Sequence, residues 1–324
     1  MNPDDVVQEF HDRTQVQKSD TTAERYTSNV RKWVAWLTEE REKDIWEVNG
    51  GDFRMFVRYL LNEGYAPNTV LSVQSGVSIF YQALAEMKEE GYDIPEVDNP
   101  TEGFDRTQYS ALRGRDVTKK AKHLREDVYY LQPEEVELLA QNVSAPKLRN
   151  RLIVKLLYQT GLRRGELSNI RLSDIDRRER SINIYAEKTH ENRVVYYQPS
   201  LDTLLSVWID AERNAVITAD ESPYLFPTKK SENIYKHHVT RIVTDAATEA
   251  GLQEFLYTDM NGNDVKKVSA HTLRHSFAVQ SLKNGMNVRT VQKLLGHADI
   301  QTTMIYLKVA EDDVAEEARR YGPK

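Results

Sequence analysis

The sequence predicts a mainly α-helical protein with one small β-sheet, divided into a smaller N-terminal helical domain and a larger C-terminal domain. Apolar residues recur at the three- and four-residue spacing of amphipathic helices over most of the chain. Strand-type alternation surrounds a polar break at residues 187–192. Residues 93–112 are rich in Pro, Gly, Asp and Thr without periodicity, which is typical of a linker. A chain of 324 residues is long enough for two compact domains.

The N-terminal domain is predicted to be all-helical. Between residue 21 and about residue 88, three successive segments carry helical periodicity, and in the first of them Tyr26, Val30 and Trp33 lie on one stripe. We expect residues 1–19 to form an N-terminal extension ahead of the first helix. We expect residues 20–110 to form the helical domain.

A basic linker at 111–130 is expected to join the domains. The whole chain has a net charge of -6 and a pI near 5.8, which is unlike the basic footprint of many nucleic-acid-binding domains. Residues 113–125, however, carry six basic side chains against Asp116 alone. A local basic track can contact DNA even when the rest of the surface is acidic. Its members are Arg113, Arg115, Lys119, Lys120, Lys122 and Arg125.

The C-terminal domain, residues 131–324 including a tail, is predicted to hold more helices and a β-hairpin. Pro133 suits the first turn of one helix, and Gly161 ends the next. The strands around the polar break form a hairpin with Lys188 at its tip or first shoulder. Ser269 is a candidate helix cap, and the helix before Gly296 stops there and restarts within a few residues.

Several functional classes are excluded by composition. The chain has no cysteine, so it has no disulfide framework, thiolate zinc site or cysteine nucleophile. No run approaches the ~18 consecutive apolar residues of a membrane span, and the first residues are acidic and polar. We therefore expect a soluble intracellular protein without a signal peptide.

Polar residues within otherwise apolar helical segments are the candidate catalytic and binding residues. His271, Arg274 and His275 are three and four residues apart, so they share one helix face just after a helix start. The backbone donors and the positive dipole end favour an anion there, and arginine adds a fork-shaped cation. This pattern predicts a phosphate site. Arg163, beside Glu166, is a second arginine that a carboxylate could hold.

Taken singly, these residues have simpler interpretations. A lone histidine such as His271 or His297 is more often a cap or a satisfied partly buried residue than a catalyst. Arg163 and Glu166 could form a plain ion pair, and Tyr306 could be a core aromatic with a hydrogen-bonded hydroxyl. The ordered set decides between these interpretations.

The complete set resembles the tyrosine recombinase family, also called phage-type integrases, with a Xer-like arrangement. The matching text is "TGLRRGEL", a hairpin lysine, "HTLRHSFA", "LLGHADIQTT" and "MIYL", spread over residues 131–310. The helical unit at 20–92 is similar to the family's SAM-like core-binding domain, so the C-terminal domain would be the catalytic one. In family order the six positions are Arg163, Lys188, His271, Arg274, His297 and Tyr306.

The resemblance implies a site-specific recombinase, or integrase, that cuts and rejoins DNA through a 3′-phosphotyrosyl intermediate. Tyr306 would attack the scissile phosphate, gripped by Arg163 and Arg274. Lys188 would deliver a proton to the leaving 5′-oxygen, and His271 would be the acid/base partner of the tyrosine. His297 would hydrogen-bond the phosphate, and the supporting residues would be Glu166 and His275.

The resemblance also sets expectations about partners and location. The reaction requires no metal, ATP or other cofactor. The partner is double-stranded DNA with a specific recombination site, contacted in part by the basic linker. A tetramer of protomers on DNA and accessory directionality factors follow by family analogy. We expect a cytoplasmic, nucleoid-associated protein from an archaeal or bacterial host or its virus or mobile element.

Three alternatives stay open. A type IB topoisomerase-like enzyme uses similar chemistry but reseals the same strand. A catalytically silent protein on the same scaffold would only bind DNA. A metal hydrolase could use His271, His275 and His297, although no His-Glu-x-x-His motif accompanies them.

Overall fold

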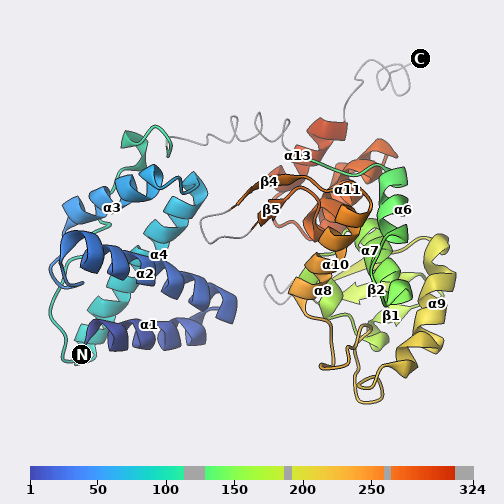
Figure 1. The fold of residues 1–324 in the computed structure, drawn as a ribbon, viewed down its shortest axis with the longest axis horizontal. Coiled ribbons are helices and arrows are strands. Elements are labelled where there is room, and N and C mark those ends of the chain that lie inside the picture. The colour runs from blue at the N-terminus through green and yellow to red at the C-terminus, as the bar shows by residue number, and fades with distance from the viewer. Residues whose placement is uncertain (113–127, 186–191, 259–263, 311–324) are drawn as a thin grey trace. The chain divides into compact units, whose positions relative to one another are not determined.

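The chain forms two compact units that divide between residues 116 and 117 in a computed structural model (Figure 1). The structure describes residues 1–112, 128–185, 192–258 and 264–310. Each unit has its own apolar core and is described by itself.

The N-terminal unit is helical and packs around a cluster of aromatic side chains. Trp33, Phe53 and Phe56 are at most 1% exposed, and the Trp33 Nε1–H donates to the Tyr81 hydroxyl at 3.0 Å. The Tyr81 hydroxyl in turn donates to the Ile45 carbonyl at 3.0 Å, so the polar atoms of this core are satisfied. The elements are α1 (Pro3–Gln17), α2 (Asp20–Arg41), α3 (Gly50–Asn62), α4 (Pro67–Glu89) and the 3-10 turn η1 (Arg106–Gln108).

Helix α1 corrects our expectation for the first residues. We expected an extension ahead of a first helix near residue 20, but α1 occupies Pro3–Gln17 and packs on α2. Val6, Phe10 and Thr14 repeat at four-residue spacing and are buried, so this helix contributes to the core. The Asn2 side chain caps α1 by accepting from the Asp5 backbone N–H at 2.8 Å.

The segment at 93–112, which we predicted as a linker, is irregular but packs on the N-terminal unit. Ile94 and Leu112 are buried in the same core as the helices. The Asn99 side chain also donates to the Ser78 carbonyl at 3.2 Å. The N-terminal unit therefore includes this segment.

In the C-terminal unit, three helix ends lie at the residues that the sequence predicted. Pro133 is the first residue of α6, Gly161 ends α7 with a φ of 64°, and the Ser269 hydroxyl caps α11 by accepting from the His271 N–H at 3.2 Å. Its helices are α6 (Pro133–Gln141), α7 (Lys147–Thr160), α8 (Arg164–Ser168), α9 (Asp202–Asp210), α10 (Lys236–Glu249), α11 (Ala270–Lys283), α12 (Val288–Leu295) and α13 (Gln301–Ala310), with the 3-10 turns η2 (Leu172–Asp174), η3 (Pro199–Leu201) and η4 (Glu212–Ala215).

The predicted hairpin is confirmed as part of a three-stranded antiparallel sheet. The order is β1 (Ile175–Asp176), β2 (Ser181–Ile184) and β3 (Arg193–Tyr196), with Ile182 opposite Val195. Lys188 lies outside the described residues. A second, two-stranded antiparallel sheet pairs β4 (Phe255–Thr258) with β5 (Asp264–Lys266).

Packing within the C-terminal unit brings its last helices together. Helix α11 packs against both α7 and α13. Phe277, Val291, Leu295 and Tyr306 form a small apolar cluster among α11, α12 and α13. The predicted fold class, mainly α-helical with a small sheet and two domains, is confirmed. None of the helices in the described ranges is both long enough and apolar enough to span a bilayer.

Candidate active site

The turn between α7 and α8 positions Arg163. Gly161 ends α7 in the left-handed region, and a Cβ on it would lie 2.4 Å from Phe277 Cδ1, so only glycine fits. The chain then turns into α8, for which Arg163 is the N-cap residue. Its backbone N–H donates to Glu166 Oε2 at 2.8 Å, and its Nη1 donates to Oε1 at 2.9 Å. The predicted Arg163–Glu166 pair is therefore present.

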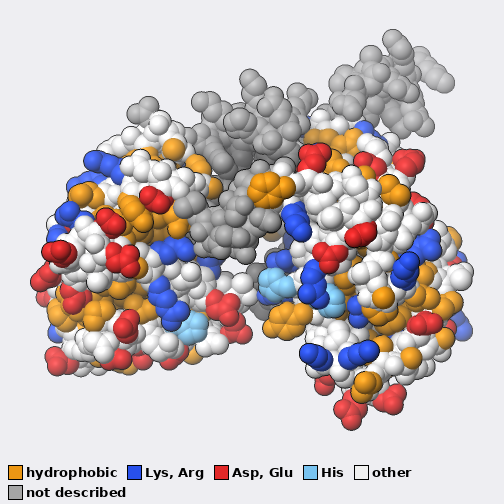
Figure 2. All heavy atoms as spheres, in the orientation of Figure 1, with side chains coloured by type: hydrophobic (Ala, Val, Ile, Leu, Met, Phe, Trp, Pro, Cys, Tyr) orange, Lys and Arg blue, Asp and Glu red, His pale blue; other side chains and the backbone are white. Residues whose placement is uncertain are grey.

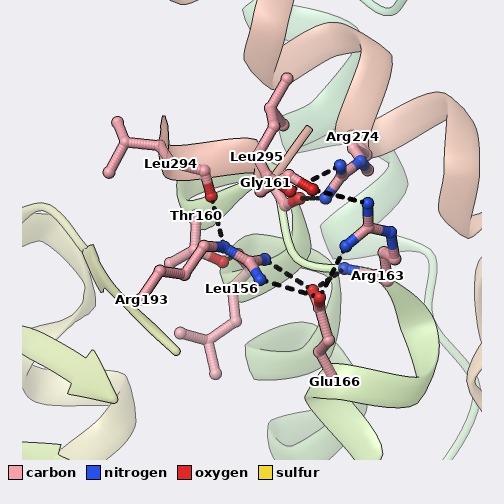
Figure 3. A network of polar contacts seen from close by, with 10 residues as sticks. Leu156, Thr160, Gly161, Arg163, Glu166, Arg193, Arg274, Leu294 and Leu295 are labelled. Atoms are coloured by element: carbon pink, nitrogen blue, oxygen red, sulfur yellow. Dashed lines mark hydrogen bonds and ion pairs between the residues drawn. The ribbon is translucent and has the colours of Figure 1, made fainter. Parts of the chain in front are cut away.

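Glu166 holds a second arginine, Arg193 of β3 (Figure 3). The two Nη groups of Arg193 donate to the two carboxylate oxygens at 2.9 and 2.7 Å, and its Nε donates to the Leu294 carbonyl at 2.7 Å. Burial by itself would raise the pKa of Glu166, but the hydrogen bonds and charges of Arg193 and Arg163 hold that pKa below its ordinary value. Glu166 is thus an ionised anchor for two cations.

Arg274 is held by backbone carbonyls at the C-terminal ends of two helices, α7 and α12. It lies on α11, is 1% exposed, and donates from Nη1 to the Gly161 carbonyl and from Nη2 to the Leu295 carbonyl, both at 2.7 Å (Figure 3). Arg163 Nη2 donates to the neighbouring Gly296 carbonyl at 3.0 Å. Burial, together with the positive charge of Arg163, lowers the pKa of Arg274 to about 10. Two guanidinium groups are therefore held beside the C-terminal end of α12.

Tyr306 of α13 is buried, and its hydroxyl has a partner. It is 4% exposed and packs in the apolar cluster of α11, α12 and α13. Its hydroxyl lies 2.8 Å from Nδ1 of His275 on α11. Burial raises the pKa of Tyr306, against the positive charges of Arg274 and Arg163, which act to lower it. The phenol is neutral at rest, and its oxygen lies within hydrogen-bond distance of an imidazole nitrogen.

Two histidine rings, those of His275 and His297, lie near the Tyr306 ring, and His271 packs against His275. The rings of His271 and His275 are 4.3 Å apart, and the ring of His297 lies 6.2 Å from that of Tyr306. His297 Nδ1 is 2.9 Å from the hydroxyl of buried Thr303. Burial, followed by the positive charge of His271, lowers the pKa of His275 to about 3; for His297 burial and Arg274 lower the pKa to about 3. Both imidazoles are neutral at pH 7.

The pKa of His271 is also lower than that of a free histidine. Burial of its ring, together with the charges of Arg274 and Arg163, lowers the pKa of His271. We expected His271 to be the partner of the Tyr306 hydroxyl, whereas in this structure the contact comes from His275. Because the residues are four apart on one helix, both rings face the same region.

The structure brings most of the predicted residues into one cluster. Arg163 and Arg274 donate to the adjacent carbonyls of Gly296 and Leu295, and His275 and His297 lie beside Tyr306. The ring of His271 lies against that of His275. Lys188 and the six predicted basic residues of the linker lie outside the described residues, so their positions stay predictions. The clustered residues are Arg163, Glu166, His271, Arg274, His275, His297 and Tyr306.

Arg193 and Thr303 belong to the cluster but were missed from the sequence. Arg193 is on the same face of β3 as buried Val195, since side chains alternate along a strand. A charge on the buried face of a strand requires a partner, and that signal could have identified Arg193. Thr303 was hidden because a buried threonine on a helix gives no signal of its hydrogen-bond partner.

Within the described ranges, no three His, Asp or Glu side chains lie in a group that could hold a metal ion. The histidines of the cluster instead contact Tyr306, Thr303 and one another.

Two known protein-family models match this chain. The family model described as "Phage integrase family" matches residues 129–313, more than half of the chain. The chain belongs to the phage integrase family. A second model, "Phage integrase, N-terminal SAM-like domain", matches residues 7–88 and so includes most of α1 as well as α2 to α4. The tyrosine recombinase resemblance and the two predicted domain types are confirmed, and membership places this integrase among enzymes that cleave and join DNA strands.

Known relatives of this integrase extend over most of its length. It is 29% identical to tyrosine recombinase XerA of Pyrococcus furiosus over 277 residues, which covers 83% of this chain and 86% of the relative. It is 26% identical to tyrosine recombinase XerC of Pediococcus pentosaceus, covering 95% and 94%. The crystal structure of XerH site-specific recombinase bound to difH substrate, in its pre-cleavage complex, shares the fold with a TM-score of 0.65 at 18% identity, covering 92% of this chain and 77% of that one.

Proposed function

We propose that this integrase is a site-specific DNA recombinase that cuts and rejoins duplex DNA through a 3′-phosphotyrosyl link at Tyr306. One observation carries the proposal: the Tyr306 hydroxyl contacts a neutral histidine at 2.8 Å while the charges of Arg163 and Arg274 act on it. A core tyrosine would need only a hydrogen-bond acceptor, whereas a nucleophile for a phosphodiester needs a proton acceptor and cations for the phosphate. The names of XerA and XerC, both tyrosine recombinases, support the same class.

The two arginines bind the scissile phosphate. Arg163 keeps 41% of its side chain exposed, so part of its guanidinium remains open to a ligand. Arg274 is buried and oriented by its two carbonyl acceptors, which reduces the reorganisation required when charge develops on the phosphate. Glu166 fixes the position of Arg163 through their ion pair. This arrangement stabilises the additional negative charge of the pentacoordinate transition state.

The covalent step balances with residues of this chain. The Tyr306 oxygen forms a bond to phosphorus, and the bond from phosphorus to the 5′-oxygen of the next nucleotide breaks. The phenol proton passes to His275 Nδ1, the atom it already contacts. Lys188 protonates the leaving 5′-oxygen, a role carried over from the family resemblance. The products are a 3′-phosphotyrosyl strand and a free 5′-hydroxyl.

Substrate binding makes His275 a better base. Burial and the surrounding positive charges depress its pKa in the free protein. A phosphodiester between Arg163 and Arg274 adds negative charge to that surrounding, which favours the imidazolium. Proton transfer is therefore unfavourable until the DNA is in place, and the resting enzyme keeps Tyr306 protonated.

The remaining histidines assist this step. His297 engages Thr303 through Nδ1, which leaves Nε2 to donate to a phosphate oxygen. His271, whose ring lies 4.3 Å from that of His275, takes the predicted acid/base role by relaying the proton onward.

Rejoining follows because the phosphotyrosyl bond is itself a phosphodiester. A 5′-hydroxyl from a second duplex attacks it and releases Tyr306, so neither ATP nor a metal takes part in the steps above. Two duplexes with a specific site, and a tetramer of protomers, complete a recombination event by family analogy. The basic linker at 111–130 adds phosphate contacts that anchor the duplex.

A covalent-adduct experiment tests this proposal. Wild type, Tyr306→Phe and the control Tyr158→Phe are incubated with fragmented host and viral DNA and denatured, and the attached ends are sequenced. We expect adducts joined through a DNA 3′-phosphate from wild type and Tyr158→Phe, and none from Tyr306→Phe. Equal adduct from Tyr306→Phe, or none from wild type despite DNA binding, contradicts the nucleophile assignment.

Two further arms separate the alternatives. A requirement for two DNA sites in the joined products separates a recombinase from a topoisomerase-like enzyme, which reseals the same strand. Chelator should leave adduct formation unchanged, whereas a histidine metal hydrolase would lose activity. A silent DNA-binding protein would give no adduct under any condition.

A further inference from the structure

One buried arginine outside this cluster has no counter-charge. Arg149 lies in the first turn of α7 and is 6% exposed. In the described part of the chain, its one side-chain hydrogen bond runs from Nε to Asn150 Oδ1 at 3.0 Å, and no carboxylate pairs with it. Burial lowers the pKa of Arg149 without an opposing acidic group. Its two Nη groups, which carry most of the guanidinium donors, have no protein acceptor there.

Arg213 shows what a structural buried arginine looks like in the same unit. It is 4% exposed, and its guanidinium donates to the carbonyls of Ala219, Ser222 and Tyr224 at 2.6–3.3 Å. Every nitrogen of Arg213 therefore has an acceptor, whereas Arg149 has one for Nε alone. Among the described residues, Arg151 Nε is the one buried side-chain polar atom without a partner, so the unpaired Nη groups of Arg149 reach solvent. They are therefore open to an anion that arrives from outside.

The start of α7 supplies a second, independent donor set beside Arg149. Pro146 is the N-cap residue and gives no side-chain cap, and the first turn holds no acidic residue. Residues 144–147 are exposed. The Asn150 side chain donates to the Ser144 carbonyl at 2.9 Å and accepts from Arg149, which keeps the guanidinium at this end of the helix. Backbone N–H groups, helix dipole and guanidinium thus converge on one exposed point.

Helix α10 adds positive charge on the side that packs against α7. Its first turn contains Lys236, His237 and His238 and no acidic residue. Burial lowers the pKa of His238, and the charges of Arg149 and Arg241 lower it further, with Asp245 as the opposing carboxylate. Figure 2 shows Lys, Arg and His side chains gathered over the region of α8 and α10. Helix α8 follows the other end of α7, so only α10 bears on Arg149, through His238, on which the charges of Arg149 and Arg241 both act.

We propose that Arg149 and the N-terminus of α7 bind a backbone phosphate of the duplex DNA, separate from the scissile phosphate. This inference rests on the proposed function, since that function supplies the DNA. Arg149 and Gly161 stand at opposite ends of α7, so the two phosphate sites are separated by roughly 18 Å along the helix axis.

The test uses the full chain in the Tyr306→Phe background, which binds DNA without cutting it. Arg149→Met is compared with Arg213→Met, a matched loss of a buried guanidinium, by fluorescence anisotropy on a labelled duplex over a series of salt concentrations. For Arg149→Met we expect affinity lower by about tenfold, as for loss of one charge-assisted hydrogen-bonded contact. The slope of log affinity against log salt falls by about 0.9.

Thermal melting separates a ligand site from a structural role. Arg149→Met should melt close to or above the Tm of its parent, because its guanidinium has no carboxylate partner and one hydrogen bond to lose, whereas Arg213→Met should melt lower because three carbonyls lose their donor. A fall in the Tm of Arg149→Met equal to that of Arg213→Met overturns the proposal. Unchanged DNA affinity and salt slope in Arg149→Met overturn it too.

Inorganic phosphate at constant ionic strength serves as the second probe. It should raise the Tm of the parent more than that of Arg149→Met. If this holds while Arg149→Met binds DNA as tightly as its parent, the occupant is a free anion and the DNA assignment is wrong. Absence of DNA binding by the parent itself refutes the proposed function and this occupant together, whereas DNA binding insensitive to Arg149 refutes only the present inference.

Discussion

The Glu166→Gln substitution is the sharpest test of how the two arginines are held. Glu166 is 9% exposed and accepts from the backbone N–H of Arg163, from its Nη1, and from both Nη groups of Arg193. A glutamine of the same shape removes the charge and turns one acceptor into a donor that faces an arginine. Arg193, itself 9% exposed, then keeps its bond to the Leu294 carbonyl and one of its two bonds to residue 166.

The magnitude follows from the exposure of each partner. Breaking a buried ion pair by removing one partner costs about 3–5 kcal/mol, and Arg193 falls in this class. Arg163 is 41% exposed, so its pair adds only about 0–1 kcal/mol. Because glutamine keeps one acceptor, we take about 3 kcal/mol for the loss in free energy of unfolding. For a unit of this size that is a fall in Tm of roughly 6–12 °C.

The pH dependence gives a second signature. The folded-state pKa of Glu166 lies below its ordinary value, so its stabilising contribution is complete above ~4.3 and is lost as the pH falls through the folded pKa. The difference in Tm between wild type and Glu166→Gln should therefore be constant near neutral pH and shrink on acidification below about pH 4.

Calorimetry or circular dichroism melts provide the assay, with Glu137→Gln as the matched control. Glu137 also binds two cations, Arg151 and Lys155, but is 42% exposed. We expect the control to change the free energy of unfolding by less than about 1 kcal/mol. If Glu166→Gln melts within about 2 °C of wild type, as the control should, the reasoning from buried charge is refuted.

Three more outcomes follow from the cluster. The pKa of His275 and of His297 is about 3 in the folded protein, against ~6.5 in the unfolded chain. Their neutral forms therefore stabilise the fold, and this stabilisation is lost as the pH falls from ~6.5 towards 3. An imidazolium signal from either ring at pH 5 by NMR would contradict this. Gly161→Ala should lower the free energy of unfolding by about 2 kcal/mol or more, since it adds both backbone strain and a 2.4 Å contact with Phe277. The control Gly285→Ala, at positive φ in open space, adds strain alone. Thermal melts should therefore show a smaller loss in the free energy of unfolding for the control. Lys188→Ala should slow cleavage by about 10²- to 10⁴-fold on ordinary DNA but not on DNA with a bridging 5′-sulfur, whose thiolate leaves without a proton; equal slowing on both substrates would assign the general acid elsewhere.

Local features of this protein could be predicted because their causes are local. Ser269 caps α11, Gly161 ends α7, and Gly296 separates α12 from α13, each through the backbone conformation or side-chain bond of one residue. The hairpin of β2 and β3 followed from alternation. The motif order likewise identified the family, since it depends on residue types and their sequence and not on distances.

Elements with weak local signals were mistaken or missed. Helix α1 was missed because only a narrow stripe of Val6, Phe10 and Thr14 marks it among polar residues. The segment at 93–112 has the composition of a linker, yet Ile94 and Leu112 bury it against the N-terminal core. Strand β1 spans Ile175–Asp176, too short for periodicity to indicate.

The sequence by itself determined the fold class, the helix ends around the site and the identity of the residues that cluster there. Tertiary structure alone decided which of them touch. His271 and His275 share one helix face, and only the packing of α11 on α13 places His275 on the Tyr306 hydroxyl. Similarly, Arg193 meets Glu166 and Arg149 remains without a counter-charge, because burial and pairing depend on atoms that are far apart in the chain.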